Sequence, residues 1–248
     1  MNRDGVKIIR DIAYVDDNNP KHKLDLYLPK DKTNYPMVYF VHGGNWDGGD
    51  KNFYQWITGL YGNIGIVLAK QGIGVAVVNY RLYPQTNVEG MLEDVIQGVE
   101  YIMDHASEYG YNPKIYLMGH SAGGHLVTFL ATQSKLDIAA VVALSPVLDV
   151  PAMTSKSEDD YKERIIYPLF GKTTGEQKKF SPSTYWSNIK VPVCVMVGEY
   201  DHGHVREMGV LLAQAKVFPE YSHTDLVVKI GSNNDLVTPE ILKCVRVS

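Results

Sequence analysis

Gly119-His120-Ser121-Ala122-Gly123 is the stretch of sequence that decides the fold. A short apolar run rich in strand formers, 114–118, precedes it, and residues 124–130 continue with helical spacing. Glycines two residues to either side of the serine allow a strand and a helix to approach closely without a Cβ clash. The pattern predicts a nucleophile elbow, and the alternative is a glycine-rich connection with an incidental serine.

Buried strands alternate with helices on both sides of this turn. Uninterrupted apolar runs indicate strands covered on both faces, and apolar residues three and four apart indicate helices packed on the sheet. This alternation predicts an α/β fold with a mostly parallel central sheet and helices on both faces. The predicted strands are 37–41, 74–79, 114–118, 139–144 and 192–197, and the predicted helices are 53–68, 88–103, 124–130 and 205–213.

The ends of the chain depart from this alternation. Residues 24–28 alternate strictly between apolar and polar, and a turn-forming stretch separates them from a first strand at 8–15. We therefore expect a leading antiparallel hairpin. Near the other end, Thr238 followed by proline predicts an N-cap that opens a last helix, which ends at about Val245.

Length, composition and charge indicate one ordinary globular domain over residues 1–248. The chain is 45% hydrophobic and 21% charged, which argues against disorder. The net charge of −4, without a local Lys/Arg cluster, argues against a nucleic-acid partner. Residues 150–191 are richer in charge and turn formers, so we expect a small helical, lid-like excursion over the carboxyl edge of the sheet, with a plain surface connection as the alternative.

The sequence also predicts a cytoplasmic protein without a membrane span. The first residues lack the apolar core of a secretory signal, and no segment reaches the roughly 18 uninterrupted apolar residues of a spanning helix. The two cysteines, Cys194 and Cys244, are predicted to be buried thiols and not a disulfide or a thiolate metal site. The oligomeric state does not follow from the sequence.

A serine hydroxyl is a poor nucleophile at neutral pH, so an active elbow needs a histidine base and a carboxylate that orients it. Reactive groups in an open α/β sheet gather at the carboxyl ends of the strands. Asp201 follows the predicted strand 192–197, and His223 follows a short candidate strand, 215–218. The chain order serine, aspartate, histidine is the order of an α/β-hydrolase. Asp149 also follows a strand and is the alternative acid.

Five motifs resemble those of the α/β-hydrolase superfamily, in the group of small serine carboxylesterases that includes arylformamidases, feruloyl and acetyl esterases and isoprenylcysteine methylesterase-like enzymes. They occur in family order and span nearly the whole chain. The motifs are His42-Gly43-Gly44-Asn45-Trp46, Asn79-Tyr80-Arg81-Leu82-Tyr83-Pro84, Gly119-His120-Ser121-Ala122-Gly123-Gly124, Gly198-Glu199-Tyr200-Asp201 and His223-Thr224-Asp225-Leu226.

The resemblance implies a serine hydrolase that cleaves small-molecule esters through an acyl-enzyme, without a cofactor. Ser121 is then the nucleophile, His223 the general base and later the general acid, and Asp201 the orienting carboxylate. An arylformamidase acting on N-formylkynurenine would use the same groups. A non-catalytic binding protein with this fold is the third possibility, and such proteins generally lose one of the three residues.

The resemblance also implies an oxyanion hole made of the backbone N–H groups of Gly44, Asn45 and Ala122. Trp46 is then expected to pack beside this loop, and His42 to brace it without transferring protons.

The remaining histidines near the motifs are predicted to pack or to line the pocket. His120 and His125 flank the nucleophile, while His202 and His204 follow Asp201 too closely for the usual base position. No third ligand accompanies His202 and His204, so a metal site is not expected. Only 22 positions separate Asp201 from His223, which limits the helix at 205–213 to little more than two turns.

Overall fold

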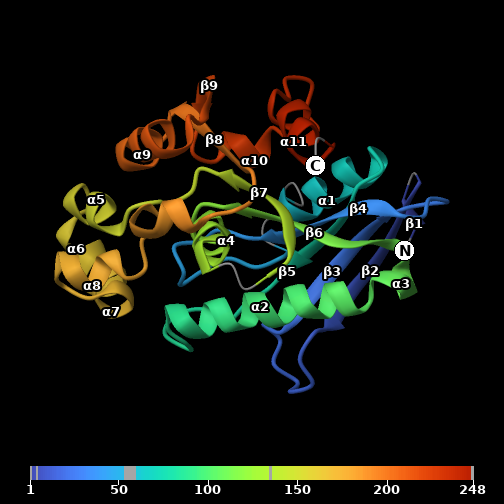
Figure 1. The fold of residues 1–248 in the computed structure, drawn as a ribbon, viewed down its shortest axis with the longest axis horizontal. Coiled ribbons are helices and arrows are strands. Elements are labelled where there is room, and N and C mark those ends of the chain that lie inside the picture. The colour runs from blue at the N-terminus through green and yellow to red at the C-terminus, as the bar shows by residue number, and fades with distance from the viewer. Residues whose placement is uncertain (1, 4, 53–59, 134–135, 247–248) are drawn as a thin grey trace.

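The computed structural model describes residues 2–3, 5–52, 60–133 and 136–246. A central sheet lies between two layers of helices (Figure 1). The first part of the predicted helix 53–68 lies outside the described residues. Its described part belongs to α1 (Leu60–Lys70).

Nine described strands form one sheet in the order β1-β2-β3-β5-β4-β6-β7-β8-β9. The pairs at the β1 edge, as far as β3 with β5, are antiparallel, and every pair from β5 to β9 is parallel. The predicted parallel sheet with an antiparallel N-terminal hairpin is therefore confirmed. The strands are β1 (Asn2–Arg3), β2 (Val6–Ala13), β3 (Lys23–Pro29), β4 (Tyr35–Val41), β5 (Gly74–Val78), β6 (Tyr111–His120), β7 (Ile138–Leu144), β8 (Val193–Tyr200) and β9 (Lys216–Ser222).

Each face of the sheet has its own hydrophobic core, and β4 shows why its sequence is apolar throughout. Tyr39 and Val41 point into one core, while Val38 and Phe40 point into the other. All four side chains are fully buried, and burial of Val38, Phe40 and Val41 contributes about 1.5–3 kcal/mol each to folding. If apolar and polar residues alternated along β4, one face of the strand would be polar and could not pack against a helical layer.

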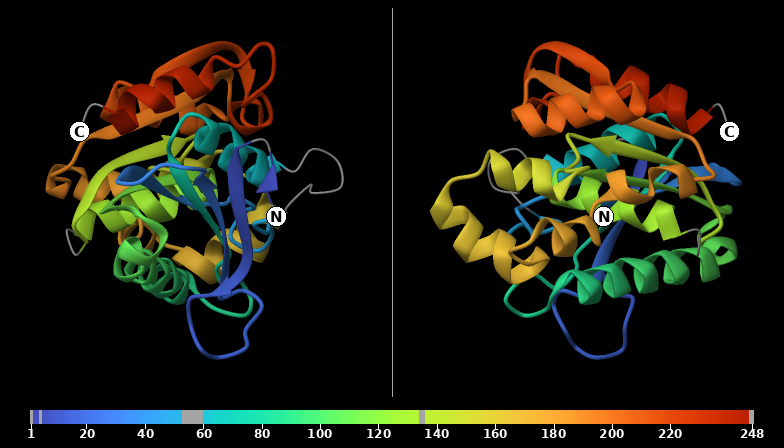
Figure 2. Two further views of the ribbon diagram at one scale, coloured as in Figure 1. Left: turned by 90° about the vertical axis from the view of Figure 1, so that its right-hand side faces the viewer. Right: turned by 60° about the vertical axis from the view of Figure 1, so that its left-hand side comes forward.

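The two helical layers lie on opposite sides of the sheet (Figure 2). None of the described helices combines the length and apolar character needed to cross a bilayer. One layer holds α1, α10 (Asp225–Val228) and α11 (Val237–Arg246), and the other holds α2 (Val88–Asp104), α4 (Ala122–Gln133) and α9 (Gly203–Ala213), with the short α3 (Ala106–Tyr109) after α2.

Between β7 and β8 the chain forms a series of short helices, grouped at one end of the sheet in Figure 1. Leu169 and Phe170 anchor this segment, because both are buried in the same core as α4. The helical character predicted for 150–191 is therefore present. The elements are α5 (Val150–Ser155), α6 (Asp159–Tyr161), a π-helical turn (Lys162–Ile166), α7 (Tyr167–Phe170), α8 (Thr174–Lys178) and a 3₁₀ segment (Pro182–Asn188).

The helix between Asp201 and His223 is longer than the sequence predicted. α9 has 11 residues, about three turns, because it begins at Gly203 and not at 205. Gln214, with a φ of 49°, then turns the chain directly into β9. The final strand extends to Ser222, beyond the predicted 215–218, so His223 is the first residue after it.

The last helix also begins differently from the prediction. It starts at Val237, and the carboxylate of Asp235 accepts hydrogen bonds from the N–H groups of Val237 and Thr238, each at 2.9 Å. Asp235 thus supplies the capping oxygen that the sequence pattern had assigned to Thr238. A carboxylate at this end also interacts favourably with the helix dipole.

Candidate active site

The turn that the sequence predicts to be a nucleophile elbow lies between β6 and α4. Ser121 has a φ of 54°, which a non-glycine residue adopts only when surrounding contacts hold it there. Its N–H donates to the Leu144 carbonyl at 2.9 Å, and its own carbonyl accepts from the His125 N–H at 2.9 Å. These bonds to β7 and to the first turn of α4 stabilise the strained turn. The Ser121 side chain lines a pocket.

Glycine is required on both sides of this serine. A Cβ on Gly123 would lie 2.1 Å from the Val41 carbonyl oxygen, and one on Gly119 would lie 2.4 Å from the Gly123 oxygen. Both separations are far shorter than a van der Waals contact, so any side chain would push α4 away from the end of β4. The spacing of the motif therefore reflects backbone packing.

Asp201 and His223 meet at the ends of β8 and β9. Nδ1 of His223 lies 2.7 Å from Oδ1 of Asp201. The same carboxylate accepts the N–H of His202 at 2.8 Å and, through its other oxygen, the buried hydroxyl of Ser145. Because a carboxylate can only accept, Nδ1 of His223 carries the proton, and Nε2 is left as a base.

Asp201 is held in its ionised form. Burial by itself would raise the pKa of Asp201, but the hydrogen bond and charge of His223, the Ser145 hydroxyl and the His202 N–H outweigh burial and keep that pKa below its ordinary value. Sequence reasoning missed Ser145. Its only signal was a position at the end of a predicted strand, which many serines share.

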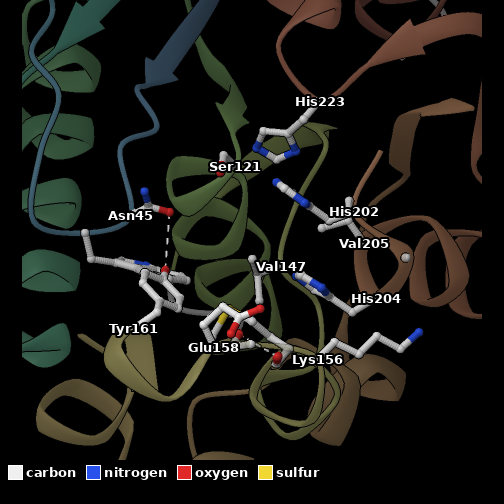
Figure 3. A pocket seen from close by; sticks show the side chains of 14 residues that line it. Asn45, Ser121, Val147, Lys156, Glu158, Tyr161, His202, His204, Val205 and His223 are labelled. Carbon is white, nitrogen blue, oxygen red and sulfur yellow. Dashed lines mark hydrogen bonds between the residues drawn. The ribbon is translucent and has the colours of Figure 1, made fainter. Parts of the chain in front are cut away.

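Ser121 and His223 line one pocket of about 410 Å³, together with Asn45. Figure 3 shows the imidazole of His223 beside Ser121, with His202 next to it. No hydrogen bond joins the Ser121 hydroxyl to the His223 ring among the described residues. Catalytic hydrogen bonds of this kind often tighten only when substrate binds.

The alternative acid, Asp149, serves a different purpose. Its Oδ1 accepts the N–H of Ala152 at 2.8 Å, and its Oδ2 accepts the hydroxyl of Ser183 at 2.7 Å. Asp149 is thus the N-cap of α5 and joins that helix to the 3₁₀ segment that leads back to β8. His223 is paired with Asp201 instead.

The loop after β4 contains three consecutive residues with positive φ, Gly44, Asn45 and Trp46. A Cβ on Gly44 would lie 2.3 Å from the Gly48 carbonyl oxygen, so the tight turn requires glycine. Within the described part of the chain, the backbone N–H groups of Gly44, Asn45 and Ala122 donate to no protein acceptor. These are the three donors predicted for the oxyanion hole.

His125 holds this loop against the short helices. Trp46 is buried, and its indole N–H donates to Nδ1 of His125 at 3.3 Å. Nε2 of His125 donates in turn to the Phe180 carbonyl at 2.8 Å. Burial lowers the pKa of His125 to about 4, against the opposing effect of the Phe180 bond, so the ring is neutral and uses one nitrogen to accept and the other to donate. The predicted packing role is confirmed.

The other histidines divide between core and pocket. His42 is buried, stacks on Tyr80 with ring centroids 4.6 Å apart, and hydrogen-bonds the Gly43 carbonyl at 2.7 Å, as expected of a bracing residue. His202 and His204 line the pocket. Across the described ranges, no group of three or more His, Cys, Asp or Glu is arranged to hold a metal ion.

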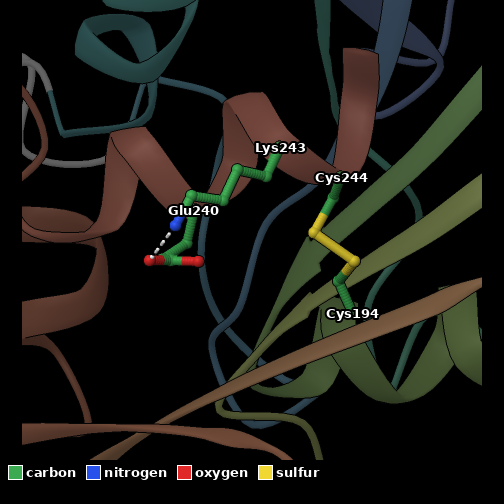
Figure 4. Close-up of a disulfide and its surroundings, with 4 residues drawn as sticks. All are labelled: Cys194, Glu240, Lys243 and Cys244. Carbon is green, nitrogen blue, oxygen red and sulfur yellow. Dashed lines mark hydrogen bonds and ion pairs between the residues drawn. A yellow bond between two sulfur atoms is a disulfide. The ribbon is translucent and has the colours of Figure 1, made fainter. Parts of the chain in front are cut away.

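Cys194 and Cys244 form a disulfide, so the prediction of two buried thiols was wrong. Figure 4 shows the bond between β8, the strand that ends just before Asp201, and α11. The two cysteines lie 50 positions apart in sequence. Their pairing depends on α11 folding back over β8, and nothing in the spacing of two cysteines predicts that.

The parallel strands β4, β6, β8 and β9 end at the same edge of the sheet, and each one delivers part of the site. This arrangement, with the elbow between β6 and α4, defines an α/β-hydrolase. The fold is shared with esterase B from Lactobacillus rhamnosis, at a TM-score of 0.81 and 20% identity over 99% of this chain and 88% of that one.

Residues 24–215 match the family model BD-FAE, so the chain belongs to the BD-FAE family. A probable isoprenylcysteine alpha-carbonyl methylesterase from Oryza sativa subsp. japonica is 39% identical over 197 residues, 72% of this chain and 44% of that protein. A similarly named Arabidopsis thaliana protein is 42% identical over 47% of this chain and 23% of its own length. The chain thus spans less than half the length of these plant relatives. Kynurenine formamidase from Danio rerio is 25% identical over 90% of this chain and 78% of its own.

The buried neutral histidines predict a pH-dependent stability. Burial lowers the pKa of His42 and His125 to about 4 and that of His120 to about 3, against 6.5 ordinarily. Between these values the unfolded chain binds protons that the folded chain does not, so the free energy of unfolding falls as the pH drops below about 6.5. Each histidine contributes up to about 1.4 kcal/mol per pH unit. Urea denaturation of wild type and His125→Gln from pH 7.5 to 4.5 should show a shallower slope in the variant. Equal slopes would contradict this assignment.

The disulfide predicts a cross-linked peptide and a loss of stability on its removal. Non-reducing digestion followed by mass spectrometry should recover Cys194 and Cys244 in one species. Cys244→Ser should lower the free energy of unfolding by about 4 kcal/mol, the chain-entropy value for a loop of this length. The reducing agent serves as the control, because it should destabilise the wild type and leave Cys244→Ser unchanged. Two alkylatable thiols in the native, unreduced protein would refute the bond.

Proposed function

We propose that this protein hydrolyses small carboxylic esters through an acyl-enzyme on Ser121. The observation that carries the proposal is the 2.7 Å Asp201–His223 pair, which places a histidine with a free Nε2 in the same pocket as a serine on a strained elbow. The names of the relatives, methylesterases and formamidases, support cleavage of an acyl group. A non-catalytic binding protein would have no need to keep this geometry.

In the proposed mechanism, Ser121 attacks the ester carbonyl while Nε2 of His223 takes its proton. The ionised Asp201 stabilises the resulting imidazolium and keeps the ring in the correct tautomer. His223 then protonates the leaving alcohol. After that it activates the water that releases the acid. No cofactor takes part.

The oxyanion would be stabilised by the backbone N–H groups of Gly44, Asn45 and Ala122. These donors have no protein acceptor among the described residues, and the positive φ values of the loop hold them in place before substrate binds. Pre-oriented donors of this kind contribute about 3 kcal/mol each in the transition state. Trp46, buried and bonded to His125, keeps the loop from relaxing.

We further propose that residues 150–191 act as the roof of the pocket and select the substrate. The pocket is lined from this segment by Met153, Lys156, Glu158 and Tyr161. Figure 3 labels the last three. The Tyr161 hydroxyl donates to Oδ1 of Asn45 at 3.3 Å. This bond joins the roof to the loop after β4 that contains Gly44, Asn45 and Trp46, which we call the oxyanion loop. A pocket of about 410 Å³ with two charged side chains suits a small, polar ester better than a long acyl chain.

A cytoplasmic location stays a prediction, and the disulfide is evidence against it. Disulfides persist in oxidising compartments and are rare in reducing ones. Cys194 and Cys244 are paired in the structure.

Removal of the Ser121 hydroxyl should abolish esterase activity. With p-nitrophenyl acetate, Ser121→Ala should lose at least about 10³-fold in kcat, because the acyl-enzyme cannot form. A fluorophosphonate probe should label wild type and not the variant. Ser232→Ala is a suitable control that should keep wild-type activity, since its exposed hydroxyl accepts the Asn234 N–H outside the pocket. Undiminished turnover by Ser121→Ala, or a wild type that the probe does not label, would refute the proposal.

The second candidate, an arylformamidase, is favoured by the likeness to the Danio rerio protein over most of both chains. A formyl amide could use the same serine, base and donors. We expect acetyl and butyryl esters to give a higher kcat/KM than N-formylkynurenine, and a decanoyl ester to give a lower value than either short ester because the pocket is small. Steady-state kinetics over this panel tests the ranking. A kcat/KM for formylkynurenine above that of every ester would reverse the assignment.

A further inference from the structure

A chain of hydrogen bonds, buried except at its partly buried His223 end, connects Gly43, at the start of the oxyanion loop, with the backbone of the proposed base. The N–H of Gly43 donates to the hydroxyl of Tyr61 at 3.2 Å. That hydroxyl lies 3.4 Å from Nδ1 of His120. On the other side of the ring, Nε2 of His120 lies 3.1 Å from the carbonyl oxygen of His223.

The donor and the acceptor of each of these three hydrogen bonds follow from the chemistry of Gly43, Tyr61, His120 and His223. The His223 carbonyl can only accept, so Nε2 of His120 carries the proton. Burial, helped by the nearby charge of His223, lowers the pKa of His120 to about 3, so the ring is neutral and its Nδ1 is an acceptor. The Tyr61 hydroxyl therefore donates to Nδ1, and its oxygen accepts the Gly43 N–H. Each group in the chain uses its donor and acceptor consistently.

The location of the chain makes it more than a core contact. Gly43 immediately precedes the loop with the unpaired N–H groups, and His120 immediately precedes Ser121. A Cβ on Gly43 would lie 3.0 Å from Nδ1 of His120 and 3.1 Å from Cβ of Ser121, so the loop rests directly on the elbow. The His120 and His223 rings are also in contact, with centroids 5.0 Å apart.

Burial makes these bonds costly to break. The side chains of Tyr61 and His120 are almost entirely excluded from solvent. A buried donor or acceptor without a partner costs about 1–3 kcal/mol, so the structure resists any separation of the two loops. The Ser145 hydroxyl also lies 3.5 Å from the His223 carbonyl, but its single hydrogen is donated to Asp201.

We propose that His120, together with Tyr61, is a positioning residue that fixes the distance between the base and the oxyanion loop. This inference rests on the proposed esterase function. His120 does not exchange protons with substrate, because both of its nitrogens are engaged with protein groups and its ring stays neutral. It acts through the backbones of Gly43 and His223. A displacement of about 1 Å at such a site can lower the rate by about 100-fold.

Variants at both positions test the proposal with p-nitrophenyl acetate. His120→Leu removes both bonds and should lower kcat by about 30-fold or more, with KM changed less than about threefold, because ground-state binding does not use the chain. His120→Gln keeps an amide N–H near the position of Nε2 and should recover at least about one third of the lost activity on a logarithmic scale. Tyr61→Phe should lower kcat by about three- to tenfold.

Tyr111→Phe is the matched control for Tyr61→Phe. Its buried hydroxyl donates to the Ile102 carbonyl at 2.6 Å, at the opposite end of β6 from Ser121. Both variants lose one buried tyrosine hydroxyl, so both should lose stability in a thermal melt. Only Tyr61→Phe should lose kcat. The rate of fluorophosphonate labelling should follow kcat, because it reports the reactivity of Ser121 directly.

Three outcomes would overturn the inference. They are a folded His120→Leu with the kcat of wild type, a Tyr61→Phe that loses no more kcat than Tyr111→Phe, and a His120→Gln no better than His120→Leu. If His120→Leu does not fold, the comparison of kcat between Tyr61→Phe and Tyr111→Phe tests the inference. Activity retained in Ser121→Ala would overturn the esterase function itself, whereas an inactive Ser121→Ala beside fully active His120 and Tyr61 variants would overturn only the positioning role.

Discussion

The close packing of the elbow against the end of β4 is the constraint on which the site depends. The first turn of α4 approaches so near to Val41 that Gly123 has no room for a side chain, and Gly119 is restricted in the same way. This contact forces Ser121 into a left-handed conformation at the apex. It also brings the serine to the start of the oxyanion loop. One backbone contact therefore sets the position of the proposed nucleophile and of the proposed oxyanion donors nearest to it.

Two buried histidines, His125 and His120, hold the loops around the site. Each ring accepts one hydrogen bond and donates another. His125 accepts from Trp46 and donates to Phe180, which joins the oxyanion loop to the short helices. His120 accepts from Tyr61 and donates to the carbonyl of His223. Both rings are neutral because burial disfavours their protonated forms. A neutral imidazole suits this task, since it has one donor and one acceptor on opposite sides of a rigid ring.

The proposed acid and base lie on the last two strands of the sheet, and β9 is its edge strand. Asp201 and His223 lie at the ends of the last two strands, and α9 between them packs chiefly on β8. The disulfide from Cys194 to Cys244 reinforces this edge by joining β8 to the last helix. Cys194 lies on β8, the strand that leads into Asp201. The disulfide and the Asp201–His223 hydrogen bond therefore both limit the movement of β8.

The local sequence pattern determined the order of the secondary-structure elements and the position of the elbow. The elbow and the order of strands and helices follow from glycine placement and hydrophobic periodicity, which are properties of neighbouring residues. Tertiary structure decided the rest. The Ser145 hydroxyl on Asp201, the disulfide, the Asp235 cap and the contacts of His120 all depend on which segments meet in space. Sequence spacing carries no information on such contacts, because a hydrogen bond or a disulfide forms between atoms that only the packing of distant strands and helices brings together.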